Sequence, residues 1–147
     1  MERVYGMPVR FVATKKFTPA NAYPEREFQP GEISEGSVDN FESISRNNPG
    51  SIVEIEMTKE DWINLGTSRA LACKKRIAEL TALYGFDFSS PYYSVIPTSE
   101  DEKVDGTGYG GGLPDAYRKT HLLEADVARF EQQCIEQLSK SSGSTKK

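Results

Sequence analysis

The sequence predicts an α+β fold in which two long helices pack on a small, about three-stranded β-sheet. Two long stretches repeat their apolar residues at helical spacing, and three short stretches are rich in β-branched and aromatic residues. The segments 15–50 and 97–114 show neither period, so we expect long irregular arms there. A chain of 147 residues suits one domain, which we expect to cover 1–138.

Three short segments are the expected strands. Residues 52–57 alternate apolar side chains, from Val53 onward, with two glutamates, which is typical of a half-buried strand. A further strand is expected over 92–96, where Pro97 ends it. The first strand lies within 4–14 and has one mostly apolar face. The residues of that face are Val9, Phe11 and Ala13.

The arm over 15–50 is punctuated by proline and glycine, and no regular period crosses it. Its aromatic residues argue against plain disorder, because flexible linkers contain few of them. We expect it to lie on a surface, either this protein's own or a partner's. The pattern allows one short helix over 38–46, with Ser37 as its N-cap and with Phe41 and Ile44 facing inward.

Residues 58–84 form the best-defined predicted element, a helix that Thr58 caps and Gly85 ends. Its apolar residues recur at steps of four and three and so form one stripe. The stripe comprises Trp62, Gly66, Ala70, Cys73, Ile77, Leu80 and Tyr84. The opposite face carries Arg69, Lys74, Lys75, Arg76 and Glu79. Because Gly66, Ala70 and Cys73 are small, we expect close packing or an interface there, against the last helix, the sheet or another subunit.

A second helix closes the chain and begins near Leu113, Pro114 or Asp115. Its apolar stripe comprises Leu123, Val127, Phe130, Cys134 and Leu138. No apolar residue follows this stripe, so we expect 139–147 to be a disordered tail.

The net charge of −4 gives no general attraction to nucleic acid or anionic lipid. The first residues lack the apolar run of a signal peptide, and no stretch approaches the roughly 20 apolar residues of a membrane span. We therefore expect a soluble, cytoplasmic protein. Cys73 and Cys134 fall on apolar stripes, which predicts two buried thiols, while a disulfide between the two helices remains open.

No motif predicts catalysis, a cofactor or a metal site. The glycines of 106–111 match the spacing of dinucleotide-binding loops, but they follow an acidic run instead of a strand, which favours a mobile loop. His121 is the only histidine, so no paired-histidine site is available. A Cys–His pair would use Cys73 or Cys134, whose thiolates are disfavoured on apolar stripes. We therefore expect that the protein is not an enzyme.

An alternative interpretation concerns residues 58–80. The segment from Asn64 to Arg69, followed by basic residues near Lys75, resembles the turn and recognition helix of bacterial helix-turn-helix proteins. Trp62 stands where that motif needs a small residue, and Lys75 stands where it has an apolar one. The resemblance implies a DNA-binding regulator whose contacting residues are Thr67, Ser68, Arg69, Lys74 and Lys75.

These patterns favour a non-enzymatic protein-interaction module: an adaptor, inhibitor or accessory subunit of a larger assembly. A phage or bacterial origin fits its size and acidity. The expected partner is another protein, with a homo-oligomer as an open alternative, and the candidate partner-binding residues are Tyr23, Phe28 and Tyr109. A DNA-binding regulator is the first alternative function, and a small ligand-binding protein or enzyme is the second.

Overall fold

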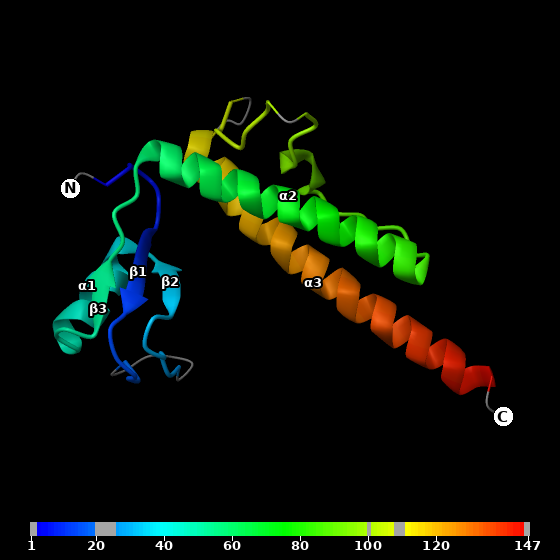
Figure 1. Cartoon of the computed structure of the whole chain (residues 1–147), viewed down its shortest axis with the longest axis horizontal. Helices are drawn as coiled ribbons and strands as arrows, with labels where there is room; N and C mark the ends of the chain where they lie inside the picture. The colour runs from blue at the N-terminus through cyan, green and yellow to red at the C-terminus, as the bar shows by residue number, and fades with distance from the viewer. Residues whose placement is uncertain (1–2, 20–25, 100, 108–110, 146–147) are drawn as a thin grey trace. The chain divides into compact units, whose positions relative to one another are not determined.

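The computed structural model describes residues 3–19, 26–99, 101–107 and 111–145, with side chains as far as residue 140 (Figure 1). Over these residues the predicted α+β fold is confirmed, with a three-stranded antiparallel sheet and two long helices among its elements. The chain divides into two compact units, Met1–Lys59 with the sheet and Glu60–Lys147 with the long helices. The expectation of one domain over 1–138 stays a prediction.

The sheet of the first unit has the strand order β2-β1-β3, and both of its strand pairs are antiparallel. Its bounds are Val9–Ala13 for β1, Ile33–Gly36 for β2 and Ile52–Glu54 for β3. The predicted apolar face of β1 is confirmed, because its alternate residues Val9, Phe11 and Ala13 are buried. Ile52, the β3 partner of Ala13, is buried with them in the core of this unit.

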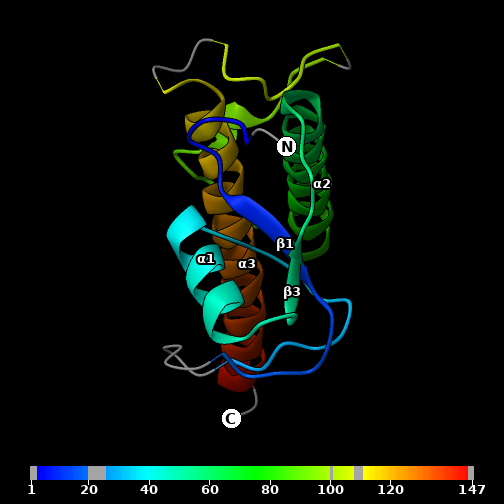
Figure 2. The same cartoon turned by 90° about the vertical axis from the view of Figure 1, so that its left-hand side faces the viewer.

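Helix α1 (Val38–Asn47) lies beside the sheet (Figure 2) and confirms the short helix that the pattern allows. Ser37 is its N-cap, and the Ser37 Oγ accepts a hydrogen bond of 3.0 Å from the Asn40 amide. Phe41 packs on Phe11 with the ring centroids 5.6 Å apart. Phe41 and Ile44 face the core of the unit, as the spacing predicts.

One predicted strand does not form, and one strand lies where none was predicted. Residues 92–96 form no strand, because Tyr93–Val95 is a 3₁₀-helix, η1, introduced by a turn in which the Tyr92 amide donates to the Ser90 Oγ. The third strand is instead β2, inside the arm over 15–50. The sequence of β2 is short and weakly patterned, and its pairing with β1 determines its conformation.

The strand expected over 52–57 is shorter than predicted and faces the other way. It ends at Glu54, and Val53 remains 53% exposed while Ile52 is buried. The register explains this, because Val53 pairs with Val12 and therefore shares the face opposite to that of Phe11.

The second unit consists of α2 (Lys59–Tyr84), α3 (Gly112–Thr145) and the connection between them, which contains η1. The predicted stripe of α2 is confirmed from Trp62 to Leu80, and Gly85 follows the helix with a positive φ of 78°. The two helices run in the same direction, since Arg69 contacts Thr120 and Arg76 contacts Glu131 further along both. The connection over 85–111 must therefore return to the start of α2, and we call it the crossover (Figure 1).

The buried residues of α3 confirm the predicted stripe at Leu123, Val127, Phe130 and Cys134, but not at Leu138, which is 55% exposed. The reason is that Leu138 follows Glu131 by seven residues and so lies beside the buried stripe, as the partly exposed Glu131 does. Helix α3 also continues past the end of α2 at Tyr84, as far as Thr145 (Figure 1). The backbone is thus helical through 139–145, within the segment expected to be a tail.

Candidate functional site

One side of the α2–α3 pair is defined by two sets of residues that recur every seven positions. On α2 these are Trp62, Arg69, Arg76 and Leu83, and on α3 they are Tyr117, Glu124, Glu131 and Leu138. Arg76 and Glu131 are separated by 55 positions, and the other three pairs have the same separation. In parallel helices with a seven-residue repeat, such positions flank the apolar seam. We call these four pairs the flank pairs.

The first flank pair is aromatic and buried. Trp62 meets Tyr117 edge to face, with the ring centroids 5.0 Å apart. The Tyr117 ring also lies against Gly66, where an added Cβ would be 3.3 Å from the Tyr117 Cδ1 and 3.6 Å from the Val104 Cγ1. The small residue at this position therefore has two neighbours within the same unit, one on α3 and one on the crossover.

The second flank pair places a cation against α3. The Arg69 side chain is only 12% exposed, although the sequence pattern places it on the face opposite the apolar stripe. Its Cζ lies 4.9 Å from the centroid of the Tyr117 ring, and its Nη1 donates to the Thr120 Oγ1 at 3.2 Å. The Arg69 Nε lies 3.9 Å from a Glu124 carboxylate oxygen. Packing on Tyr117 thus draws this arginine toward the seam.

The third flank pair is an exposed ion pair. The Arg76 Nη2 donates to the Glu131 Oε2 at 2.7 Å, and the Arg76 Nη1 lies 3.5 Å from Glu79. The hydrogen bond from Arg76 to Glu131 is the main cause that raises the pKa of this guanidinium above its ordinary value. Arg76 therefore pairs with two carboxylates at this level of the helices.

The fourth flank pair is apolar and exposed. Leu83 is 72% exposed and Leu138 is 55% exposed. Ile135, 42% exposed, precedes Leu138 by three residues and so lies roughly 60° around α3 from it. We call Leu83, Ile135 and Leu138 the leucine patch. Large apolar side chains gathered on one side of a helix pair are typical of an interaction surface.

The crossover packs along the other side of the pair. The Val104 amide donates to the Thr67 Oγ1 at 2.9 Å, and the Ser90 Oγ donates to the Asp126 Oδ2 at 2.6 Å. Thr67 and Asp126 lie on the other side of the seam from the flank pairs. Thr67 directly follows the seam residue Gly66 on α2, and Asp126 directly precedes the seam residue Val127 on α3. The leucine patch consequently faces away from these crossover contacts.

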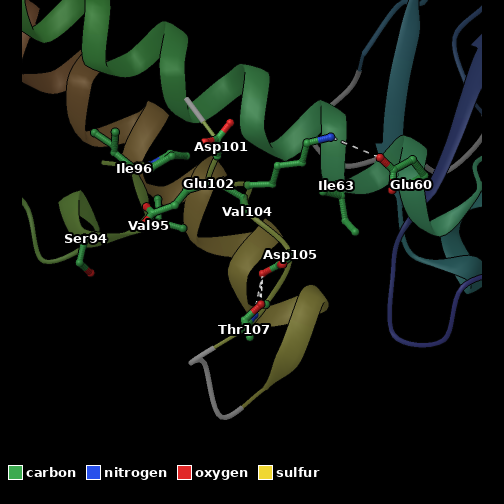
Figure 3. A pocket seen from close by; sticks show the side chains of 13 residues that line it. Glu60, Ile63, Ser94, Val95, Ile96, Asp101, Glu102, Val104, Asp105 and Thr107 are labelled. Atoms are coloured by element: carbon green, nitrogen blue, oxygen red, sulfur yellow. Dashed lines mark hydrogen bonds and ion pairs between the residues drawn. The ribbon is translucent and has the colours of Figure 1, made fainter. Parts of the chain in front are cut away.

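A second feature is a pocket of about 670 Å³ between the crossover and the first turns of α2 (Figure 3). Its lining includes the apolar side chains of Ile63, Val95 and Val104 together with several acidic residues. The Lys103 Nζ lies 3.4 Å from a Glu60 oxygen. The Thr98 amide donates to Glu102, and this hydrogen bond lowers the pKa of the Glu102 carboxyl.

The crossover glycines do not form a dinucleotide-binding loop over the part that the structure describes. Gly106 has a φ of 87°, and an added Cβ there would collide with the backbone of Gly112 and Leu113. Gly106 thus packs against the start of α3, and η1, rather than a strand, precedes it in the crossover. Within the described residues, no group of three histidine, cysteine or acidic side chains could hold a metal ion.

The predicted partner-binding residues have different outcomes. Tyr23 and Tyr109 lie outside the described residues. Phe28 is buried, stacks on Phe17 with the ring centroids 5.2 Å apart, and lies under the Arg26 guanidinium. Its ring therefore belongs to the core of the first unit.

The predicted nucleic-acid residues do not share one face. The Thr67 hydroxyl accepts a hydrogen bond from the crossover, and Arg69 packs on α3. Ser68, Lys74 and Lys75 are exposed. Gly66 lies inside the uninterrupted helix α2, so the turn of a helix-turn-helix motif is absent from it.

Cys73 and Cys134 are buried free thiols, and burial is the main cause that raises the pKa of each. A raised pKa disfavours the nucleophilic thiolate. His121, the other member of the candidate Cys–His pair, is exposed and lies against Tyr117 with the ring centroids 5.2 Å apart.

Comparisons of the chain with protein-family models, with curated proteins and with solved structures find no match. None of the helices in the described part of the chain is long and apolar enough to cross a membrane. The leucine patch escaped the sequence interpretation because Leu138 was placed in the buried stripe. The signal was nevertheless present, since an apolar residue follows two arginines at seven-residue spacing on α2.

Proposed function

We propose that this chain is a protein-interaction module whose contact surface is the leucine patch. The observation that carries the proposal is the change along the flank pairs, from a buried aromatic pair through two ion pairs to an exposed apolar pair. The exposed side chains of Leu83 on α2 and Leu138 on α3 cost solvation free energy that a bound partner would recover. An adaptor, inhibitor or accessory subunit would use such a surface.

The seam behind the patch supports the same proposal. Leu123, Val127 and Phe130 are buried together with Ile77 and Leu80, so the helices that carry the patch are held by a continuous core. A surface on a rigid helix pair loses little conformational entropy when a partner binds. The patch is therefore suited to stable docking.

The test is capture of partners from native lysate, with three tagged forms compared by quantitative mass spectrometry. Leu83→Gln/Leu138→Gln removes the patch, and Leu71→Gln is the matched control, because Leu71 is a 44% exposed leucine elsewhere on α2. We expect a protein that the wild type and the control retain and the double variant loses. Equal protein sets from all three forms would contradict the proposal.

A second candidate is binding of a small molecule in the crossover pocket. Its volume of about 670 Å³ lies in the usual range of ligand sites, and its mixed lining of apolar and charged side chains suits an amphipathic ligand. A screen by thermal shift would find it, and Val104→Trp, which fills part of the pocket, should abolish any shift. A shift that survives Val104→Trp would place the ligand elsewhere.

A further inference from the structure

We infer that the leucine patch binds the leucine patch of a second copy of this chain. The inference rests on the proposed function and names the partner of that same surface. It follows from three observations on the second unit: the pattern of its apolar residues, the pairing of the charges beside the patch, and the different lengths of its two helices.

The apolar pattern changes along the helix pair. Level with Arg69 and Arg76, the positions beside the seam hold ion pairs, as expected where only two helices meet. Level with Leu83, those positions are apolar as well, so each helix has a wider apolar face. Helices with apolar residues at the seam and also beside it are typical of bundles with more than two helices. The pattern thus predicts additional helices at this end.

The charges beside the leucine patch favour contact with the same surface of a second copy. Arg76 pairs with both Glu131 and Glu79, so each of these three charges next to the patch already has an opposite charge within 3.5 Å. A strongly acidic or basic partner would therefore gain little electrostatic binding energy at this surface. A symmetric contact brings each surface against itself, so the paired charges of Arg76, Glu79 and Glu131 could face the same paired charges of the second copy.

The lengths of the helices leave room for the partner. α2 ends at Tyr84, whereas α3 continues to Thr145, so the last turns of α3 extend past α2. A two-fold axis at the leucine patch would bring the helix pair of a second copy alongside this extension. Two helices from each copy would then meet around this axis, and the extension would gain the neighbour that isolated helical turns need.

The experiment measures the mass of the full chain in solution by sedimentation velocity, from about 1 to 100 µM. We expect a concentration-dependent species of twice the 16.4 kDa chain mass. Because a symmetric dimer contains each leucine twice, Leu83→Gln/Leu138→Gln should raise the dimer dissociation constant by about a hundredfold or more. Leu71→Gln should leave it unchanged. Circular dichroism of each variant verifies that the helices remain formed.

Two results of the mass measurement would overturn the inference: a chain that stays monomeric across the range, or a dimer that the double variant does not weaken. Each is distinguishable from failure of the proposed function. If the chain is monomeric and yet the double variant loses a captured protein, the patch binds a different partner and the interaction function stands. A dimer that dissociates as salt is raised would also contradict the inference, because the contact is apolar.

Discussion

Trp62 and Tyr117 meet edge to face with ring centroids 5.0 Å apart, and they occupy the same two helix positions as Leu83 and Leu138 further along the pair. The aromatic pair is buried, whereas both leucines are exposed. Between them, Arg69 and Arg76 make ion pairs with α3. One repeating geometry therefore supplies a core contact, two ion pairs and a candidate binding surface.

Gly66 should not tolerate a large side chain. Because an added Cβ would lie 3.3 Å from Tyr117, Gly66→Leu should lower the free energy of unfolding by about 1–3 kcal/mol. Ala78→Leu, at an exposed position of the same helix, is the control and should change it by less than about 0.5 kcal/mol. Chemical denaturation measures both, and equal effects would show that Gly66 has no close neighbour.

Arg69 should contribute more to stability than Arg76. Arg69→Ala removes the contact with the Tyr117 ring and the hydrogen bond to Thr120, and we expect a loss of about 1–3 kcal/mol in urea denaturation. Arg76→Ala removes only exposed pairs and should cost less. Arg69→Lys should recover part of the loss, because lysine keeps the charge but not the planar group. Equal losses for the two alanine variants would contradict this ranking.

The buried thiols should make the protein less stable at alkaline pH. Burial raises the pKa of Cys73 and of Cys134, so the folded state keeps these protons where the unfolded state releases them. The resulting stabilisation is fully present below the unfolded thiol pKa of about 8.5 and decreases as pH rises through the folded values. Between pH 7 and about 9.5, the wild type should lose more unfolding free energy than Cys73→Ala/Cys134→Ala. Parallel losses would show that the thiols are not responsible.

The leucine patch should contribute little to the stability of a single chain. Leu83→Gln and Leu138→Gln remove exposed side chains, so each should change the unfolding free energy by less than about 0.5 kcal/mol at low protein concentration. Leu123→Ala, by contrast, opens the buried seam and should cost about 2–5 kcal/mol. A large loss in the glutamine variants would mean that the patch is part of the core.

Ser37 should stabilise the first unit through α1. Its Oγ accepts from the Asn40 amide, and Ser37→Ala should therefore cost about 1 kcal/mol. Ser45→Ala, within the same helix, is the control and should be neutral or slightly stabilising. Hydrogen exchange of the α1 amides measures the effect locally.

Much of the fold was predictable because its signals are local. The stripe from Trp62 to Leu80, the positive φ at Gly85 and the cap at Ser37 follow from residue spacing and backbone preference. β2 could not be recognised, because four weakly patterned residues become a strand only through pairing with β1. The exposure of Leu138 could not be recognised for a related reason: its spacing from Cys134 fits the stripe, but the pairing of α3 with α2 places it beside the seam, at the position of Glu131.

The sequence by itself determined which residues form the long helices and which of their faces are apolar, because helix periodicity is a property of a single segment. Only the tertiary structure decided the parallel direction of α2 and α3 and the level at which they meet. That level depends on packing between segments far apart in the chain, such as Tyr117 against Gly66. It places Arg69 against Tyr117 and leaves Leu83 and Leu138 exposed, because the burial of a position beside the seam depends on the side chains that the other helix brings to its level.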